Sequence, residues 1–213
     1  MIFYIKAMPK IPGLARVPWT QRLADLVQTT TALPMLRLSG PFGHTSFEAY
    51  QSLVMFAGGI GITPMIAIFT DLLHRAKHGR PIGSLQSVAL VWMSRSVAEF
   101  RLFEEIFALV NSVAVLAEKN AQIDTQACKF HVRLHCTRRE SWASMAEPDS
   151  IDHVKMYVVQ GRCNVPEMIT TFVTPDDPAA TMVAACGPTP LTLATSQASW
   201  AKRTDYHAEQ FAF

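Results

Sequence analysis

The chain has 213 residues, 49% of them apolar, and a formal net charge of +2 at pH 7. A chain of this length and composition can bury a substantial core, and we expect one full domain with part of a second. The nearly balanced charge argues against a nucleic-acid-binding protein, which needs a concentrated basic surface. Four cysteines without a C-x-x-C pair are typical of a reducing compartment, so we expect the cytosol.

Few elements are predicted in residues 1–50. Ile2–Met8 and Leu36–Leu38 are expected to be short strands, and Gln21–Gln28 a short helix with Thr20 as its N-cap. Two strands and one small helix cannot form an independent β-domain, which usually needs at least three strands with a buried face. The first 50 residues are therefore expected to belong to a domain that this chain does not contain in full.

A glycine-rich turn lies near the start of residues 51–213. Leu53–Ala57 carries no charge and predicts a buried parallel strand, and glycines follow it at positions 58, 59 and 61. Apolar residues then recur at helical spacing over Met65–Arg75, with Thr63 as the expected N-cap and Pro64 at the first helical position. Glycines allow the backbone to approach a phosphate, and the free N–H groups of a helix start point at it. The turn is therefore a candidate anion site, and an ordinary tight turn is the alternative.

The rest of the chain alternates between predicted strands and helices. Strands are expected at 87–93, 130–136, 155–159, 181–185 and 206–213, and helices at 97–116, 166–172 and 191–201. This alternation predicts an α/β fold with a doubly wound, mostly parallel sheet, in which ligands bind outside the carboxyl ends of the strands. Four motifs follow predicted strands: the glycine turn, Ser94-Arg95-Ser96, Gly161-Arg162 and Cys186-Gly187-Pro188.

Arg95 and Cys186 are candidate ligand-binding residues. An arginine at the end of the second strand can pair with a ribose phosphate, whereas an acidic residue there would favour NAD through the ribose hydroxyl. No acid follows Arg95 until Glu99, so the sequence favours NADPH. The alternative for Arg95 is an ordinary solvated surface arginine, and the alternative for Cys186 is an inert buried thiol.

No metal site is expected. His131 and His135 lie four residues apart on one predicted strand, next to Cys136. Residues at that separation are about 13 Å apart along a strand, too far to bind one ion through ligand bonds of about 2 Å.

Six motifs in a fixed order resemble those of a known family. They are Gly40-Pro41-Phe42-Gly43, the stretch from Gly58 to Pro64, Trp92-Met93-Ser94-Arg95, Gly161-Arg162-Cys163-Asn164, Cys186-Gly187-Pro188 and a chain that ends in Phe213. The set resembles the cytosolic dehydrogenase region of the NADPH oxidase and ferric reductase family, within the ferredoxin-NADP reductase superfamily. The resemblance implies a ferredoxin-reductase-like NADP-binding domain over 51–213, preceded by the remnant of a β-barrel FAD-binding domain over 1–50.

The resemblance also implies roles for individual residues. Two groups of residues match the NADPH side: Gly59, Gly61 and Thr63 as the pyrophosphate turn with Pro64 beside the nicotinamide, and Arg95 with Arg162 at the adenosine 2'-phosphate. Cys186, followed by Gly187 and Pro188, matches the cysteine near the nicotinamide carbon that gives hydride. Trp19-Thr20 resembles the flavin-phosphate segment, and Phe213, or alternatively Phe211, the terminal aromatic that covers the flavin.

The implied function is the NADPH-binding part of a flavin-dependent oxidoreductase. Such a protein passes hydride from NADPH to FAD and electrons on to haem, ferric iron or oxygen. The implied partner is the transmembrane haem domain of the parent reductase, which would hold this otherwise soluble chain at the cytosolic face of a membrane. The family's His-Pro-Phe-Thr flavin segment is absent from the sequence, so we expect the C-terminal part of a larger reductase. The alternatives are a non-catalytic nucleotide-binding or regulatory fragment and a soluble flavin reductase of the same fold.

Overall fold

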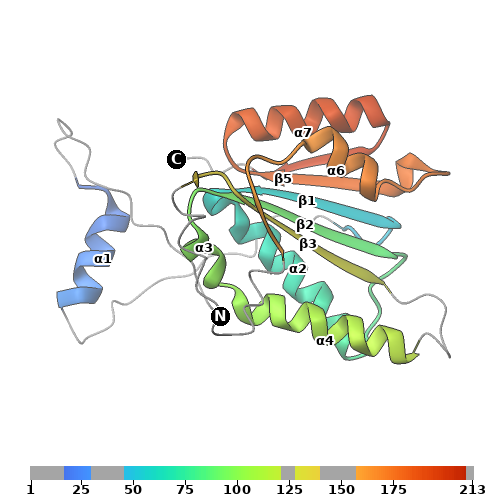
Figure 1. The fold of residues 1–213 in the computed structure, drawn as a ribbon, viewed down its shortest axis with the longest axis horizontal. Coiled ribbons are helices and arrows are strands. Elements are labelled where there is room, and N and C mark those ends of the chain that lie inside the picture. The colour runs from blue at the N-terminus through green and yellow to red at the C-terminus, as the bar shows by residue number, and fades with distance from the viewer. Residues whose placement is uncertain (1–16, 30–45, 121–127, 140–156, 210–213) are drawn as a thin grey trace. The chain divides into compact units, whose positions relative to one another are not determined.

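A computed structural model describes residues 17–29, 46–120, 128–139 and 157–209 (Figure 1). The chain divides into two compact units, Met1–Thr45 and Ser46–Phe213, and each is described by itself. The predicted strands at 2–8 and 36–38 lie outside the described residues.

Helix α1 (Trp19–Thr29) is the described part of the first unit. The expected N-cap at Thr20 is wrong, because the helix begins at Trp19 and Thr20 is its second residue. The carbonyl group of Pro18 accepts hydrogen bonds from the N–H groups of Gln21 and Arg22, both at 3.1 Å, and this closes the first turn ahead of Thr20.

The second unit contains a six-stranded, all-parallel sheet with the strand order β4-β3-β2-β1-β5-β6. The strands are β1 (Ser52–Gly58), β2 (Ser87–Ser94), β3 (Lys129–Cys136), β4 (Val158–Gln160), β5 (Thr181–Cys186) and β6 (Asp205–Glu209). The predicted α/β class and parallel sheet are confirmed. Residues 210–213, the predicted end of the last strand, lie outside the described part.

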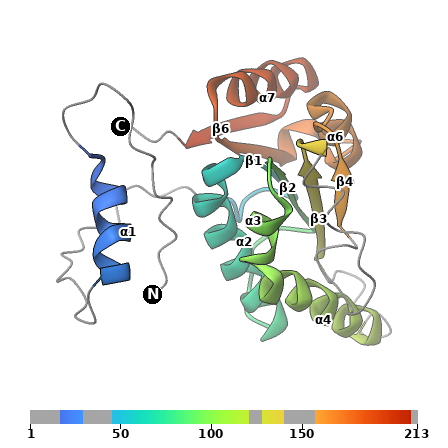
Figure 2. The same cartoon turned by 60° about the vertical axis from the view of Figure 1, so that its left-hand side comes forward.

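Helices cover both faces of this sheet, as Figures 1 and 2 show. One face carries α2 (Ile62–Lys77), α3 (Val97–Arg101) and α4 (Glu104–Asn120), and the other carries α6 (Val165–Phe172) and α7 (Thr189–Lys202). Short 3-10 turns lie at η1 (Gly59–Gly61) and η2 (Pro178–Ala180). The sheet is therefore doubly wound, as predicted.

The single helix predicted over 97–116 is interrupted. A turn at residues 102–103 separates α3 from α4, and there the N–H group of Phe103 donates to the carbonyl of Phe100 at 3.1 Å. The turn allows both phenylalanine rings to pack edge-on against Trp92, with ring centroids 4.8 Å and 5.4 Å from the Trp92 ring. Packing against one buried tryptophan thus accounts for the break.

Strand β1 lies at the centre of the core. All of its seven residues are buried, as expected for a parallel strand with both faces covered. Leu53, Met55 and Ala57 contact the cluster under α2, whereas Val54 and Phe56 contact the cluster under α6 and α7.

The chain changes direction across the sheet between β4 and β5. Strands β2 to β4 are added on one side of β1, and β5 and β6 on its other side. Strands β1 and β5 therefore flank the topological switch point, where open α/β sheets bind their ligands at the carboxyl ends of the strands.

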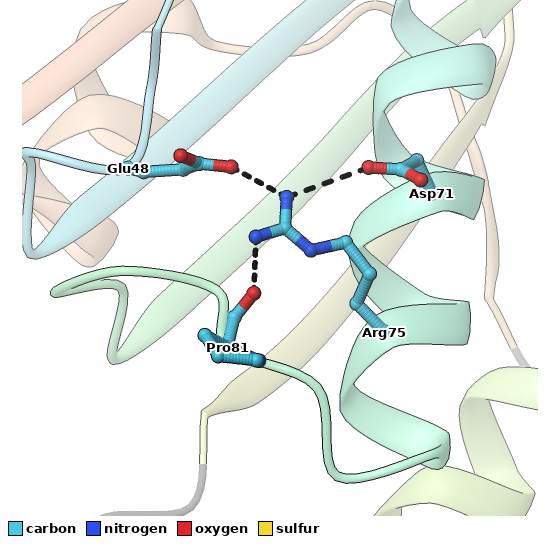
Figure 3. A network of polar contacts seen from close by, with 4 residues as sticks. All are labelled: Glu48, Asp71, Arg75 and Pro81. Carbon is cyan, nitrogen blue, oxygen red and sulfur yellow. Dashed lines mark hydrogen bonds and ion pairs between the residues drawn. The ribbon is translucent and has the colours of Figure 1, made fainter.

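At the opposite, amino edge of the sheet, Arg75 near the end of α2 joins three segments of chain (Figure 3). Its guanidinium donates to the Glu48 carboxylate and to the Pro81 carbonyl, and it lies 3.6 Å from the Asp71 carboxylate. The Glu48 carboxylate, followed by Asp71, raises the pKa of Arg75. The Glu48 carbonyl also accepts from the N–H group of Ser84 at 2.7 Å, so this network fixes the connection between α2 and β2.

We expect Arg75→Ala to lower the free energy of unfolding by about 1 kcal/mol, because it removes one guanidinium hydrogen bond to a carbonyl and a half-exposed ion pair. Urea denaturation measures this change. Arg80→Ala is the matched control, since Arg80 is exposed on the same loop and its side chain has no partner within the described residues. Equal stability of the two variants would contradict a structural role for Arg75.

Candidate functional site

The glycine turn lies at the carboxyl end of β1. Gly59 has a φ of +54°, and the 3-10 turn η1 joins β1 directly to α2. The N-cap of α2 is Gly61, so the predicted N-cap at Thr63 is wrong. The helical turn begins earlier than the sequence pattern suggested, and Thr63 lies inside α2 with its hydroxyl donating to the Ile60 carbonyl at 3.2 Å.

The turns after β1 and β5 touch through their backbones. A Cβ atom at Gly61 would lie 2.2 Å from the carbonyl oxygen of Cys186, and one at Gly187 would lie 2.9 Å from the Cα atom of Gly58. Gly187 also has a φ of +151°. By contrast, a Cβ atom at Gly59 would meet no atom within 4 Å, so the space above Gly59 is open. The predicted motifs at Gly58–Gly61 and Cys186–Pro188 are therefore brought together at the switch point.

Trp92 supports the glycine turn from the neighbouring strand. Its indole N–H donates to the carbonyl of Gly59 at 3.0 Å, and its side chain is 1% exposed. Trp92 is paired in register with Ala57, close to the end of β1. This role of Trp92 was not predicted, although a tryptophan near the end of the neighbouring parallel strand was a usable signal.

Cys186 is the last residue of β5 and is completely buried. Burial, together with the Glu209 carboxylate, raises the pKa of its thiol to about 11. The thiol is therefore protonated at neutral pH and is not a thiolate nucleophile. Pro188 precedes α7 as its N-cap. Phe211 and Phe213 lie outside the described residues.

Arg95 and Arg162 lie at the same edge, one residue after β2 and two residues after β4. Both are exposed, and within the described residues neither guanidinium has a hydrogen-bond or ion-pair partner. The following Asn164 caps α6 by accepting from the N–H group of Glu167 at 3.5 Å. Burial, with a contribution from Glu167, raises the pKa of the intervening Cys163 thiol to about 12, so this cysteine is also protonated at neutral pH.

The two histidines of β3 face the α6 side of the sheet. The His131 ring packs against Phe172 with centroids 5.0 Å apart, and His135 is buried, which lowers its pKa. Cys136, one position further along the strand, belongs to the opposite face. In the part of the chain that the structure describes, no group of three or more His, Cys, Asp or Glu side chains is arranged to hold a metal ion.

Trp19 and Thr20, the predicted flavin-phosphate residues, lie in the first turn of α1 in the other unit. The Trp19 side chain is 60% exposed. Along α1 the apolar side chains of Leu23, Leu26 and Val27 follow it at helical spacing.

The fold and this edge define a class of protein. An open, doubly wound parallel sheet with a glycine turn and helix N-termini at its switch point is the architecture of dinucleotide-binding domains. The chain belongs to the family described as "Ferric reductase NAD binding domain", which matches residues 50–199. Residues 50–199 thus form a nicotinamide-nucleotide-binding domain of that family.

Relatives are found among oxidases and ferric reduction oxidases. Dual oxidase 2 of Rattus norvegicus is 30% identical over 125 residues, which cover 54% of this chain and 8% of that protein. Ferric reduction oxidase 7, chloroplastic, of Arabidopsis thaliana is 42% identical over 71 residues, covering 32% of this chain and 9% of that protein. The aligned part of the chain thus spans less than a tenth of the length of either relative.

A similar solved structure is that of the CS-b5R domains of human Ncb5or in the NAD+ form. It is 19% identical in sequence with a TM-score of 0.45, over 79% of this chain and 39% of that one. Within the described residues, none of the helices combines the length and apolar character needed to cross a bilayer.

Proposed function

We propose that this chain binds NADPH and presents the nicotinamide ring to FAD in a larger flavin-dependent oxidoreductase. When FAD is bound, it accepts the hydride and releases electrons one at a time. The work of this chain's residues is to bind the nucleotide, select the phosphorylated form and orient the nicotinamide.

One observation carries the proposal: the open glycine turn and two exposed arginines lie along one edge of the sheet. The open space at Gly59 admits a pyrophosphate next to the N-terminal end of η1 and α2, where the helix dipole favours negative charge. Arg95 and Arg162 lie further along the edge, exposed and without a side-chain partner among the described residues. An extended dinucleotide fits this arrangement, with its pyrophosphate at the turn and its ribose phosphate at the arginines.

The remaining roles follow from this placement. Gly59, Gly61 and Thr63 hold the pyrophosphate, and Pro64 lies beside the nicotinamide. Cys186, Gly187 and Pro188 lie beside the glycine turn, because the β5 turn contacts the β1 turn directly. The Cys186 thiol is neutral and buried, so its proposed role is to shape the site and orient the nicotinamide. It would reach the nicotinamide after a local movement of the β5 turn.

The flavin side of the proposal concerns other parts of the chain. Trp19 and Thr20 are proposed to contact the flavin phosphate, and Phe213 to cover the flavin ring until nicotinamide replaces it. The proposed partner is a transmembrane haem domain, which would place the chain at the cytosolic face of a membrane. The relatives' names, dual oxidase and ferric reduction oxidase, support oxygen or ferric iron as the final acceptor.

The test is the separate replacement of Arg95 and Arg162 by alanine. Each variant should bind NADPH more weakly by about 1 to 3 kcal/mol, because it loses a charge-assisted hydrogen bond to the 2'-phosphate, and should bind NADH as before. Calorimetric titration of both nucleotides measures the difference. Arg80→Ala, at the opposite edge of the sheet, should leave both affinities unchanged. An equal loss for NADPH and NADH would refute recognition of the 2'-phosphate.

A further inference from the structure

The carboxyl end of β3 lies between the two arginines of the proposed site. Ser94 of β2 pairs with Cys136 of β3, which in turn pairs with Gln160 of β4. Neighbouring strands are about 4.8 Å apart, so the ends of β2 and β4 are separated by about 10 Å. A phosphate that contacts both Arg95 and Arg162 must therefore lie above the end of β3.

A third exposed arginine follows β3 at this place. Arg138 is two residues beyond Cys136, at the same level as Arg162 beyond Gln160. Its side chain is exposed and, like Arg95 and Arg162, has no hydrogen-bond or ion-pair partner within the described residues. Three strands in a row are thus followed by an exposed arginine whose guanidinium is unpaired among the residues that the structure describes.

Most other polar groups at these strand ends bind one another, and the Ser94 hydroxyl donates to the Glu99 carboxylate of α3. The N–H group and the hydroxyl of Thr137 both donate to the Ser94 carbonyl, at 2.8 Å and 3.1 Å. The N–H group of Ser96 donates to the Ser94 hydroxyl at 3.2 Å, and the N–H group of Gly161 donates to the Cys136 carbonyl at 2.8 Å. These bonds join the three strand ends, and the arginine side chains are exposed beside them without a partner in the described part of the chain.

Cys136 contacts the backbone of the two segments that carry Arg95 and Arg138. It is completely buried, and its Sγ atom lies 3.4 Å from the carbonyl oxygen of Arg138 and 3.9 Å from that of Arg95. The thiol therefore contacts the backbone of both arginines while their side chains face solvent. With Thr137, it fixes the spacing between the β2 and β3 ends.

We propose that Arg138 is a third phosphate-binding residue, and that Thr137 and Cys136 are positioning residues that set it against Arg95. The ligand group is a phosphate monoester on the adenosine ribose, whose oxygens can accept hydrogen bonds from several guanidinium groups at once. This inference rests on the proposed function, because it assigns further residues to the same nucleotide site.

The experiment titrates the full 213-residue chain with NADPH, NADH, adenosine 2'-phosphate and adenosine 5'-phosphate. Arg138→Ala should weaken the binding of NADPH and of adenosine 2'-phosphate about tenfold, the value of one charge-assisted hydrogen bond at an exposed site. The affinities for NADH and adenosine 5'-phosphate should stay unchanged. The salt dependence of NADPH binding should also become shallower. Arg139→Ala, which removes the same charge one residue later, should leave all four affinities unchanged.

Two outcomes would overturn the assignment while the proposed function stands: an Arg138→Ala variant that keeps the wild-type preference for NADPH over NADH, or a loss of preference produced by Arg139→Ala alone. If the wild-type chain binds neither dinucleotide, the proposed function itself fails.

Two variants of Thr137 distinguish a role in positioning the arginines from a role in stabilising the fold. Thr137→Val removes the hydroxyl bonded to Ser94 at nearly constant volume, and Thr137→Ser retains it. The NADPH-to-NADH affinity ratio should fall about threefold or more in the valine variant, as expected for a displaced charge-assisted contact, and return in the serine variant. A valine variant that is less stable yet has an unchanged ratio would show that Thr137 only stabilises the fold.

Discussion

Trp92→Ala is expected to lower the free energy of unfolding by about 4 kcal/mol, the largest effect of any substitution considered for this domain. The side chain is 1% exposed and packs against the edges of Phe100 and Phe103. Alanine leaves a cavity between β2 and the turn that separates α3 from α4. It also removes the indole N–H that donates to the Gly59 carbonyl. Urea denaturation followed by circular dichroism measures the change.

Two variants separate the packing from the hydrogen bond. Trp92→Phe keeps most of the ring packing and loses the donor, so it should cost about 1 kcal/mol. Because the proposed ligand of the glycine turn is the pyrophosphate, which both dinucleotides share, Trp92→Phe should weaken the binding of NADPH and NADH equally. Trp200→Ala is the control for tryptophan removal, since Trp200 is 86% exposed and should change stability by less than about 0.5 kcal/mol. Similar stabilities for Trp92→Ala and Trp200→Ala would contradict this account of the core.

Gly61→Ala is expected to destabilise the domain by about 3 kcal/mol, because its Cβ atom would lie 2.2 Å from the Cys186 carbonyl oxygen. The obstacle is backbone on both sides, so relief requires that the β1 and β5 turns move apart. The free energy of unfolding, measured as for Trp92, tests this directly.

Gly59→Ala is the matched comparison two residues earlier. Its Cβ atom would meet no protein atom within 4 Å, and the cost comes from the positive φ, about 1 kcal/mol. The new methyl group would, however, project into the space proposed for the pyrophosphate. We therefore expect Gly59→Ala to lose more dinucleotide affinity than its stability change explains. Equal destabilisation by the two alanines would contradict the close contact at Gly61.

The strands of the second unit were predictable because burial determines their composition. A central parallel strand is covered on both faces, so Leu53–Ala57 and Ser87–Met93 are apolar runs bounded by glycine or polar residues. Once strands and helices alternate, handedness and layering leave few arrangements. The carboxyl edge, and with it the proximity of the glycine turn to Cys186, followed from the same reasoning.

The predictions that were wrong concern helix boundaries, which depend on tertiary contacts. Thr63 and Thr20 have the right chemistry for N-caps, yet both helices begin earlier. Gly61 is the N-cap of α2, and the Pro18 carbonyl accepts the hydrogen bonds that close the first turn of α1. The break between α3 and α4 depends on Trp92, which lies in another element. Local propensity carries no information about such partners.

The candidate site shows the same division. The glycine turn, Arg95 and Arg162 stand at recognisable positions after strands. The proposed contribution of β3 was not predicted, because Thr137 and Cys136 contact carbonyl groups of Ser94, Arg95 and Arg138 only through the strand register. Strand register is not encoded in the motif that precedes each turn.

The most direct test of the central claim is calorimetric titration of the purified chain with NADPH, NADH and FAD separately. The account predicts that NADPH binds more tightly than NADH, by at least the tenfold that one phosphate contact supplies, and that FAD binds weakly to this chain alone. Failure to bind either dinucleotide would contradict the account and would leave the glycine turn as a structural feature of the sheet.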